Sequence, residues 1–391
     1  MRVLFYYFHG GGGAMANFKV LLRNLAQAYP HDTYRLLGSE GADLEGLTDL
    51  PNVQHEVIPL GRSKETTRLD RALRTLPAIA RRGEIDVVWA LNLGAYRRMA
   101  VPQLLSAHNP HQIYPWSTLG GRPASLLRLA LLRWFFRRSL AVSSAVIVQT
   151  PLMANYLRRS PQAPAWIAVI PKAVETSFDV RWEPLPTRFL SMLERSEGSV
   201  RYLYVATGYP HKNHEVLIHA ADLLAQRGVR CQLVFTVDEP EVLHLGGERA
   251  AKLLETGTVV PLGWVEKRFL RALYAKADAC VMPSLLESLS SAHLEAMRWE
   301  RPQVSSDLPY ARDLCGSASL YASPRSALEW AGQMERLVLD QHLRETLVAN
   351  GRRRIACYPE LWREVADRVH EVLGRLAGSL GPQDRQELAA A

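Results

Sequence analysis

Two glutamates flank a strand-to-helix junction in the segment from Pro283 to Met297. Glu287 follows a short apolar run, and Glu295 lies eight residues further along. On one continuous helix they would be about 12 Å apart along the axis, at about 1.5 Å per residue. That separation excludes an acid/base pair that shares one proton. If Glu287 lies in a loop, the two carboxylates can instead bind hydroxyl groups at two parts of one extended ligand.

Ser290 and Ser291 lie between these glutamates, where a helix is expected to begin. The first backbone N–H groups of a helix have no partner within it, and they bind anions such as phosphate. The junction therefore suits a ligand that carries both hydroxyl and phosphate groups. The alternative is that both glutamates are solvated or interact with the helix dipole.

Lys212 is expected at the carboxyl end of another strand, which is predicted over Tyr202–Ala206. An ammonium about 4 Å from a phosphate oxygen gains about 4 kcal/mol at an effective dielectric constant of about 20. Lys212 could therefore bind a diphosphate and stabilise it as a leaving group. Asn213 is expected to cap the following helix. A surface lysine without a ligand is the alternative.

A glycine run at positions 10 to 13 separates the first apolar run from an amphipathic segment. Without Cβ atoms, Gly12 and Gly13 would let backbone amides approach a diphosphate. The strict G-x-G-x-x-G pattern fails at Met15, and no Lys-Ser or Lys-Thr follows as in a P-loop. A turn without a ligand is the alternative.

His108 ends a strand-like run in the first half of the chain. An imidazole at the carboxyl end of a strand could orient a substrate hydroxyl. A purely structural histidine is the alternative.

Alternating apolar and amphipathic segments are expected to position these residues. Strands are predicted at Arg2–Phe8, Tyr34–Leu37, Val53–Leu60, Val87–Leu91, Leu104–His108, Val146–Gln149, Ile167–Ile170, Tyr202–Ala206, Gln232–Val237, Val259–Leu262, Ala279–Met282 and Gln303–Ser305. Helices are predicted at Ala14–Ala28, Arg68–Arg82, Ser125–Arg138, Glu215–Gln226, Lys267–Ala277, Ala292–Trp299, Ser326–Leu339 and Leu361–Leu376. This alternation predicts parallel sheets covered on both faces.

The length of 391 residues favours two domains. A polar segment with weak periodicity, 176–198, is predicted to link an N-terminal Rossmann-like domain (1–175) to a second one (199–357). A final helix over about 358–378 completes the chain, and the tail 379–391 is expected to be disordered. The predicted fold class is α/β, with two doubly wound domains that face a central ligand-binding cleft.

Charge and composition suggest an anionic partner. The chain has 47 Lys and Arg against 39 Asp and Glu, a net charge of +8. Arginines between Arg122 and Arg138 alternate with leucines and aromatic residues. This pattern fits a helix at an anionic membrane surface, or a core helix whose arginine stems cover apolar surface. No nucleic-acid-binding signature accompanies the charge, so no nucleic acid is expected.

Cysteine usage and hydropathy indicate the compartment. The four cysteines are scattered and lack metal-ligand spacing, which is typical of reduced thiols in a cytoplasmic protein. No apolar run reaches the roughly 20 residues of a membrane span. A cytoplasmic location is expected, with peripheral contact at the inner face of the membrane as an option.

The segment Pro283–Met297 resembles the P-S-x-x-E-G-F-G-x-P-x-x-E-A-M signature of the retaining glycosyltransferases of family four, which have the GT-B fold. Pro261–Val265 is similar to that family's x-x-G-x-V step near the nucleotide base. Val169–Val174 resembles the strand that enters its linker, and Tyr358–Leu373 resembles its closing helix, which crosses back to the first domain. The likeness extends over the whole chain and is strongest from Tyr202 to Tyr321.

The resemblance implies a set of donor-binding residues. Glu295 would bind the ribose, Glu287 the donor sugar, and Val265 would lie near the base. The amides of Gly12, Gly13, Ser290 and Ser291 would bind the diphosphate together with Lys212. His108 would lie near the reacting sugar.

The resemblance also implies a reaction. A sugar would pass from a nucleoside diphosphate sugar to an acceptor hydroxyl by front-face attack, with retained anomeric configuration. No cofactor and no essential metal would be needed. The acceptor, a glycan or a lipid-linked glycan, would bind to the first domain, in bacterial polysaccharide or glycan biosynthesis.

Some residues depart from the family pattern. Ser288 and Ser290 replace glycines, Ala292 replaces a proline, and no arginine precedes Lys212 as a second cation for the diphosphate. Two other functions are therefore kept open. One is a nucleotide-sugar epimerase of GT-B fold, and the other is a non-catalytic scaffold at a membrane or glycan surface.

Overall fold

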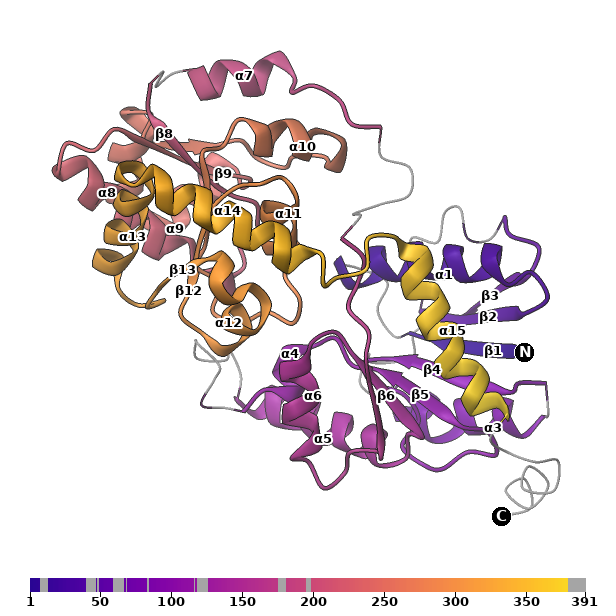
Figure 1. Ribbon diagram of the computed structural model, residues 1–391. Helices are drawn as coiled ribbons and strands as arrows, with labels where there is room; N and C mark the ends of the chain where they lie inside the picture. The colour runs from indigo at the N-terminus through magenta and orange to yellow at the C-terminus, as the bar shows by residue number, and fades with distance from the viewer. Residues whose placement is uncertain are drawn as a thin grey trace. The chain divides into compact units, whose positions relative to one another are not determined.

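The protein is divided into two compact units, which we call the first and the second domain (Figure 1). The computed structural model describes residues 1–7, 13–39, 47, 49–58, 67, 69–82, 84–115, 117, 126–174, 181–194 and 198–378. The first domain contains the described residues within Met1–Pro115, Pro123–Phe178 and Pro359–Ala391. The second contains those within Trp116–Arg122 and Asp179–Tyr358. Residues outside this description include glycines 10–12, positions 176–180 and 195–197 of the predicted linker, and the tail 379–391.

The described part of the first domain is built on a parallel sheet of seven strands, in the order β3-β2-β1-β4-β5-β6-β7. Its strands are β1 (Arg2–Tyr6), β2 (Thr33–Ser39), β3 (Val53–Ile58), β4 (Val87–Leu91), β5 (Gln103–Ser106), β6 (Ala145–Val148) and β7 (Trp166–Val169). The central strands β4, β5 and β6 are buried along their whole length, as expected for a sheet covered on both faces. The strand order reverses between β1 and β4.

Helices cover this sheet, and the last of them comes from the C-terminal end of the chain. The helical elements are α1 (Gly13–Ala28), η1 (Arg71–Thr75), α3 (Leu76–Arg81), α4 (Pro110–Ile113), α5 (Leu126–Ala141), α6 (Pro151–Arg158) and α15 (Trp362–Gly378). Phe18 of α1 and Trp362 and Val365 of α15 belong to one apolar core. The helix expected over 68–82 is a π-helical turn, η1, followed by α3. The sequence pattern misses α4 and α6, which are short.

The described part of the second domain has a parallel sheet of six strands, in the order β10-β9-β8-β11-β12-β13. Its strands are β8 (Val200–Tyr204), β9 (Cys231–Phe235), β10 (Val259–Pro261), β11 (Ala279–Met282), β12 (Gln303–Ser306) and β13 (Leu320–Ala322). The strand order reverses between β8 and β11. Ligands of doubly wound sheets bind at the carboxyl ends of the strands next to such a reversal.

The helical elements of the second domain are α7 (Thr187–Glu194), η3 (Pro210–Lys212), α8 (His214–Gln226), α9 (Glu239–Glu255), α10 (Lys267–Ala275), α11 (Ser291–Arg298), α12 (Pro309–Cys315), η4 (Gly316–Ala318), α13 (Ala327–Leu339) and α14 (Gln341–Ile355). The sequence pattern does not predict α7, α9, α12, α14 or strand β13. Helix α9 contains Gly247 with a φ of 55°, which interrupts the helical geometry and obscures the periodicity. Helix α7 lies within the predicted linker, and its Phe189 and Leu193 are buried in the core of the second domain.

Candidate functional site

The carboxyl ends of β8 and β11 bring Lys212 and Glu287 into contact. Lys212 ends η3, which follows β8, and Glu287 lies in the loop between β11 and α11. The Lys212 Nζ atom is 2.5 Å from Glu287 Oε1, and the two side chains are 20% and 13% exposed. The two residues are neighbours because their strands pair directly at the reversal of strand order. The sequence predicts both positions but not the ion pair.

The ion pair keeps Glu287 charged. Burial by itself would raise the pKa of this carboxyl, but the charge and hydrogen bond of Lys212 lower it. A hydrogen bond from Ser284 and the charge of His293 lower it further, so the pKa lies below its ordinary value. Glu287 is therefore an anion at neutral pH, able to accept hydrogen bonds from hydroxyl groups.

Buried tyrosines fix the two loops that carry this pair. The Tyr204 hydroxyl donates to the Lys212 carbonyl and shares a hydrogen bond with Ser284 Oγ, both at 2.9 Å. Tyr310 donates to the Ser284 carbonyl at 2.6 Å. These tyrosines are 80 and 26 residues away from Ser284 along the chain, and no short motif reveals them.

Asn213 also connects these loops, in place of the helix-capping role predicted for it. It adopts a left-handed backbone conformation with a φ of 57°, and its side chain makes no capping hydrogen bond to α8. Its side-chain amide donates instead to the carbonyls of Pro283 (3.1 Å) and Pro324 (2.9 Å). The carboxyl ends of β8, β11 and β13 are thereby tied together.

Helix α11 begins at Ser291, one residue before the predicted start at Ala292. Ser290 occupies the N-cap position and is 7% exposed, but its side chain makes no capping hydrogen bond. Ser291 is the first helical residue. The role of this terminus as an anion site stays a prediction.

Val265, which follows β10, is 6% exposed and packs in the core, so that only its backbone is suited to contact a nucleotide base.

Glu295 is a buried residue of α11, with 6% exposure. Tyr274 of α10 donates its hydroxyl to Glu295 Oε2 at 3.0 Å, and the Tyr274 ring packs against Trp299 at a centroid distance of 4.5 Å. Burial, followed by the charge of Glu295, raises the pKa of Tyr274 well above its ordinary value. Tyr274 therefore remains a hydrogen-bond donor that orients this carboxylate. Sequence reasoning does not identify Tyr274.

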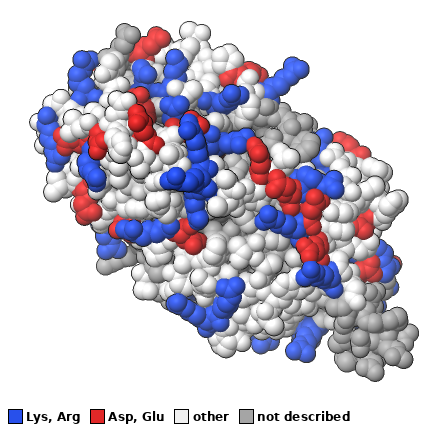
Figure 2. All heavy atoms as spheres, in the orientation of Figure 1, with Lys and Arg blue, Asp and Glu red and all other residues white. Residues whose placement is uncertain are grey.

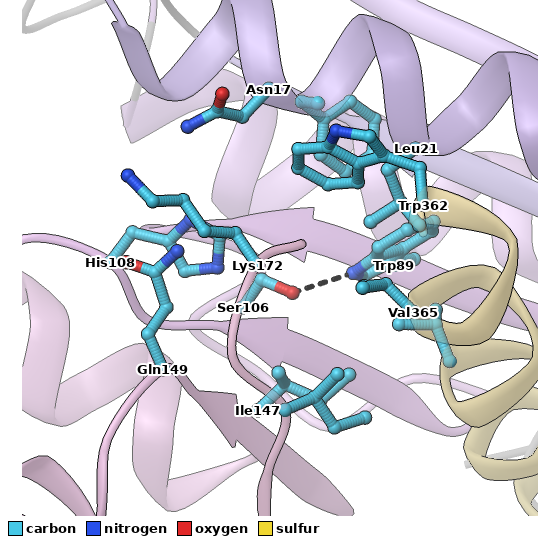
Figure 3. Close-up of a pocket in the computed structure, with 13 residues that line it drawn as sticks. Asn17, Leu21, Trp89, Ser106, His108, Ile147, Gln149, Lys172, Trp362 and Val365 are labelled. Atoms are coloured by element: carbon cyan, nitrogen blue, oxygen red, sulfur yellow. Dashed lines mark hydrogen bonds between the residues drawn. The ribbon is translucent and has the colours of Figure 1, made fainter. Parts of the chain in front are cut away.

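The first domain has a separate, partly open pocket at the carboxyl edge of its own sheet. It is lined by Asn17, Phe18, Leu21, Trp89, Ser106, His108, Ile147, Gln149, Ile170, Lys172, Trp362, Val365 and Val369. In Figure 3, Asn17, His108, Gln149 and Lys172 form one side of the pocket, and Leu21, Trp362 and Val365 form the other. The pocket is thus polar at one side and apolar at the other.

His108 is held in this pocket by Asn92, which directly follows β4. Asn92 has a φ of 63°, and its Oδ1 accepts hydrogen bonds from the backbone N–H groups of His108 (2.8 Å) and Asn109 (3.1 Å). Burial and, secondly, the charge of Lys172 lower the pKa of His108 to about 4. The imidazole is therefore neutral at pH 7.

Of the two glycines predicted to contact a diphosphate, Gly13 is the first residue of α1, whereas Gly12 lies outside the described residues.

In the part of the chain that the structure describes, we find no helix with the length and apolar character needed to span a bilayer.

Comparison with known proteins identifies the family of both domains. A sequence model described as "Glycosyltransferase Family 4" matches residues 18–178, and one described as "Glycosyl transferases group 1" matches residues 199–340. The alpha-D-kanosaminyltransferase of Streptomyces kanamyceticus is 27% identical over 264 residues. This match covers 65% of the chain and 66% of that relative, slightly less than two thirds of its length.

Solved structures share the fold along almost the whole chain. Sucrose-phosphate synthase from Thermosynechococcus elongatus has a TM-score of 0.70 at 18% identity, over 97% of this chain and 100% of that one. Anabaena Alr3699/HepE, solved in complex with UDP and glucose, has a TM-score of 0.67 at 16% identity, over 95% and 99% of the two chains. The two parallel-sheet domains are thus those of a GT-B fold. The chain belongs to the family-four type of glycosyltransferases.

Proposed function

We propose that the protein transfers a sugar from a nucleoside diphosphate sugar to an acceptor hydroxyl, with retention of the anomeric configuration. The observation that carries this proposal is the contact between Lys212 and Glu287 at the strand reversal of the second domain. A cation and an anion meet there beside the start of α11, which suits a ligand with a diphosphate and a sugar next to each other.

In this proposal the donor binds to the second domain and breaks the ion pair between Lys212 and Glu287. The Lys212 ammonium moves from Glu287 to the diphosphate, where its charge stabilises the leaving group. The Glu287 carboxylate then accepts hydrogen bonds from hydroxyls of the donor sugar. The first amides of α11, at Ser290 and Ser291, contact the phosphates. The fold shared with a protein that binds UDP and glucose supports this assignment.

The nucleoside is assigned to the neighbourhood of Glu295. This carboxylate, oriented by Tyr274, accepts hydrogen bonds from the ribose hydroxyls, and the backbone at Val265 contacts the base. Glu287 lies four residues before the first residue of α11 and Glu295 lies four residues after it. We therefore assign them to different parts of the donor, and they do not act as a pair that shares one proton.

The acceptor is assigned to the pocket of the first domain. His108 is neutral there, so it can accept a hydrogen bond from a hydroxyl or donate one without bringing a charge. The apolar side of the pocket, with Leu21 and Trp362, suits the carbon face of a sugar. We propose a glycan or a lipid-linked glycan as acceptor, in polysaccharide or glycan biosynthesis.

A donor screen tests the proposal. A nucleoside diphosphate at 100 times its dissociation constant stabilises the native state by about 2.7 kcal/mol, so thermal-shift measurements should identify the base. Each stabilising donor is then incubated with a glycan acceptor panel, and release of nucleoside diphosphate is measured with and without a chelator. We expect acceptor-dependent release that survives chelation, and NMR of the product should show the donor's anomeric configuration.

The same screen separates the other functions. A donor sugar that is converted without any acceptor would indicate an epimerase. No thermal shift and no turnover with any donor would contradict the proposal and leave a non-catalytic role.

A further inference from the structure

Helix α5 (Leu126–Ala141) of the first domain is apolar on two opposite faces. Its inward face buries Leu129, Phe136 and Leu140. Its outward face carries Leu127, Leu131 and Trp134, which are 72%, 50% and 54% exposed. Their spacing of four and three residues aligns them on one side of the helix. Such a contiguous apolar stripe marks a contact surface.

Exposed arginines surround this stripe. Arg138 lies four residues after Trp134 and continues the same side of the helix, while Arg128 and Arg137 lie beside it. Tyr96 stacks on Phe135 of α5 at a centroid distance of 5.4 Å. The exposed Arg97 and Arg98 follow Tyr96 directly in the sequence, so they lie close to α5 as well.

The charge of the chain is concentrated in this part of the first domain. The 88 residues from Val87 to Val174 contain ten Lys and Arg and no Asp or Glu, whereas the rest of the chain has 37 and 39. In the view of Figure 2, acidic atoms gather over α15, while the surface over α4, α5 and α6 shows basic and uncharged atoms. The apolar stripe therefore lies in a surface that attracts anions.

We propose that the outward face of α5 docks the first domain onto an anionic lipid bilayer. Leucine and tryptophan side chains enter the boundary between headgroups and acyl chains, and the arginines contact lipid phosphates. Tryptophan favours this boundary because its ring is apolar and its N–H is polar. A nucleic acid would use the arginines but would have no use for Leu127 and Leu131.

The docking helix is connected to the loop that follows His108. Arg133 of α5 is buried, and its Nε donates to the His111 carbonyl at 2.8 Å. A second guanidinium nitrogen donates to the Tyr114 carbonyl. These contacts hold α4, which begins two residues after His108.

Membrane docking goes beyond the proposed sugar transfer. Its test measures vesicle binding alone, so docking and transfer can fail separately.

Vesicle co-sedimentation tests this proposal with the full chain. Vesicles of phosphatidylcholine alone are compared with vesicles that contain phosphatidylglycerol as well. We expect the protein to sediment with the anionic vesicles and to bind them less at high salt, because salt screens the arginine–phosphate attraction. Sedimentation that is equally weak with both vesicle types would overturn the proposal.

Two kinds of variant separate the stripe from the charges. The double variant Leu127→Glu/Leu131→Glu should lower the partition coefficient at least tenfold, since it places two carboxylates against the headgroups. Arg137→Gln and Arg138→Gln should each lower it about fivefold. Leu328→Glu/Leu339→Glu is the matched control, because these leucines of α13 are 61% and 79% exposed in the second domain. It should bind like the wild type.

The leucines of the stripe are exposed, so the double variant should keep the melting temperature of the wild type. Should it unfold, the arginine variants decide alone. Unchanged binding of the leucine variant would overturn membrane docking. Binding to duplex DNA that equals vesicle binding and persists in the leucine variant would also overturn it and indicate a polyanion site.

Discussion

Each domain places a lysine beside a titratable side chain at the carboxyl edge of its sheet, with opposite consequences. In the second domain, Lys212 opposes the effect of burial and keeps Glu287 ionised. In the first domain, Lys172 adds to the effect of burial and keeps His108 neutral. One edge is therefore an ionic site suited to phosphates and hydroxyls. The other offers a neutral hydrogen-bonding ring in a pocket whose described lining residues include no Asp or Glu.

The contrast between the two sites depends most on whether the ionic site of the second domain is catalytic. Glu287→Gln keeps the shape of the side chain but removes its charge, so it should lower kcat about 10²–10³-fold, as does loss of one preorganised charge-stabilising group. Affinity for the nucleoside diphosphate should change less than about threefold, since the carboxylate is assigned to the sugar. Glu300→Gln, at the exposed ion pair with Arg352, is the control. Near wild-type turnover of Glu287→Gln would contradict the assignment.

The ion pair itself can be broken by Lys212→Ala. Because burial then acts on Glu287 without a compensating charge, the pKa of Glu287 should rise. In the wild type, the pair stabilises above the unfolded-state pKa of Glu287 and is lost as pH falls through its lowered folded-state pKa.

The variant should therefore lose more stability at pH 8 than at pH 4. A fully buried pair costs about 3–5 kcal/mol to break, and the partial exposure of these side chains reduces our expectation to about 2 kcal/mol at pH 8. Denaturant unfolding at both pH values measures the difference. An equal loss at both would show that the lysine acts through packing. The double variant Lys212→Ala/Glu287→Gln should recover part of the loss.

The second carboxylate of the ionic site is tested by Glu295→Ala. We expect the dissociation constant of the nucleoside diphosphate to rise about tenfold, because one hydrogen-bonded charged contact contributes about 1.5 kcal/mol. Titration calorimetry measures this change, and circular dichroism checks that the fold is intact. An unchanged dissociation constant would remove Glu295 from the nucleoside site.

Tyr274→Phe should have a smaller effect in the same direction. Loss of the hydrogen bond that orients Glu295 should weaken nucleotide binding about fivefold, corresponding to about 1 kcal/mol. Tyr202→Phe is the matched control, since its buried hydroxyl donates to the Met334 carbonyl at 2.6 Å, away from both glutamates. A similar loss of binding in both variants would indicate general destabilisation.

The variant Lys172→Met tests how the charge of Lys172 affects the pKa of His108 in the first domain. Without this charge the pKa of His108 should rise from about 4 but remain below the ordinary 6.5, because burial is the larger cause of its lowering. NMR titration of the imidazole measures the change, with Lys19→Met as control. A falling or unchanged pKa would show that Lys172 does not act on His108.

Much of the fold follows from local patterns. Strands β4 and β11 begin and end at the residues that the apolar runs predict. Helix α7 and helix α9 do not follow from such patterns. The former spans only eight residues, so the helical spacing of its apolar residues extends over about two turns, too few to predict a helix, and the latter is interrupted at Gly247. Both helices bury side chains in the core of the second domain, and this packing stabilises them beyond what the local pattern predicts.

The sequence by itself determined which residues stand at the ends of strands: Lys212 after β8, Glu287 after β11 and His108 after β5. These positions follow from apolar runs that end in polar residues. Only the tertiary structure decided what each of them touches. Lys212 and Glu287 are 75 residues apart, and Tyr274 reaches Glu295 across 21. Such contacts depend on strand order and side-chain direction, which long-range packing sets and no local spacing records.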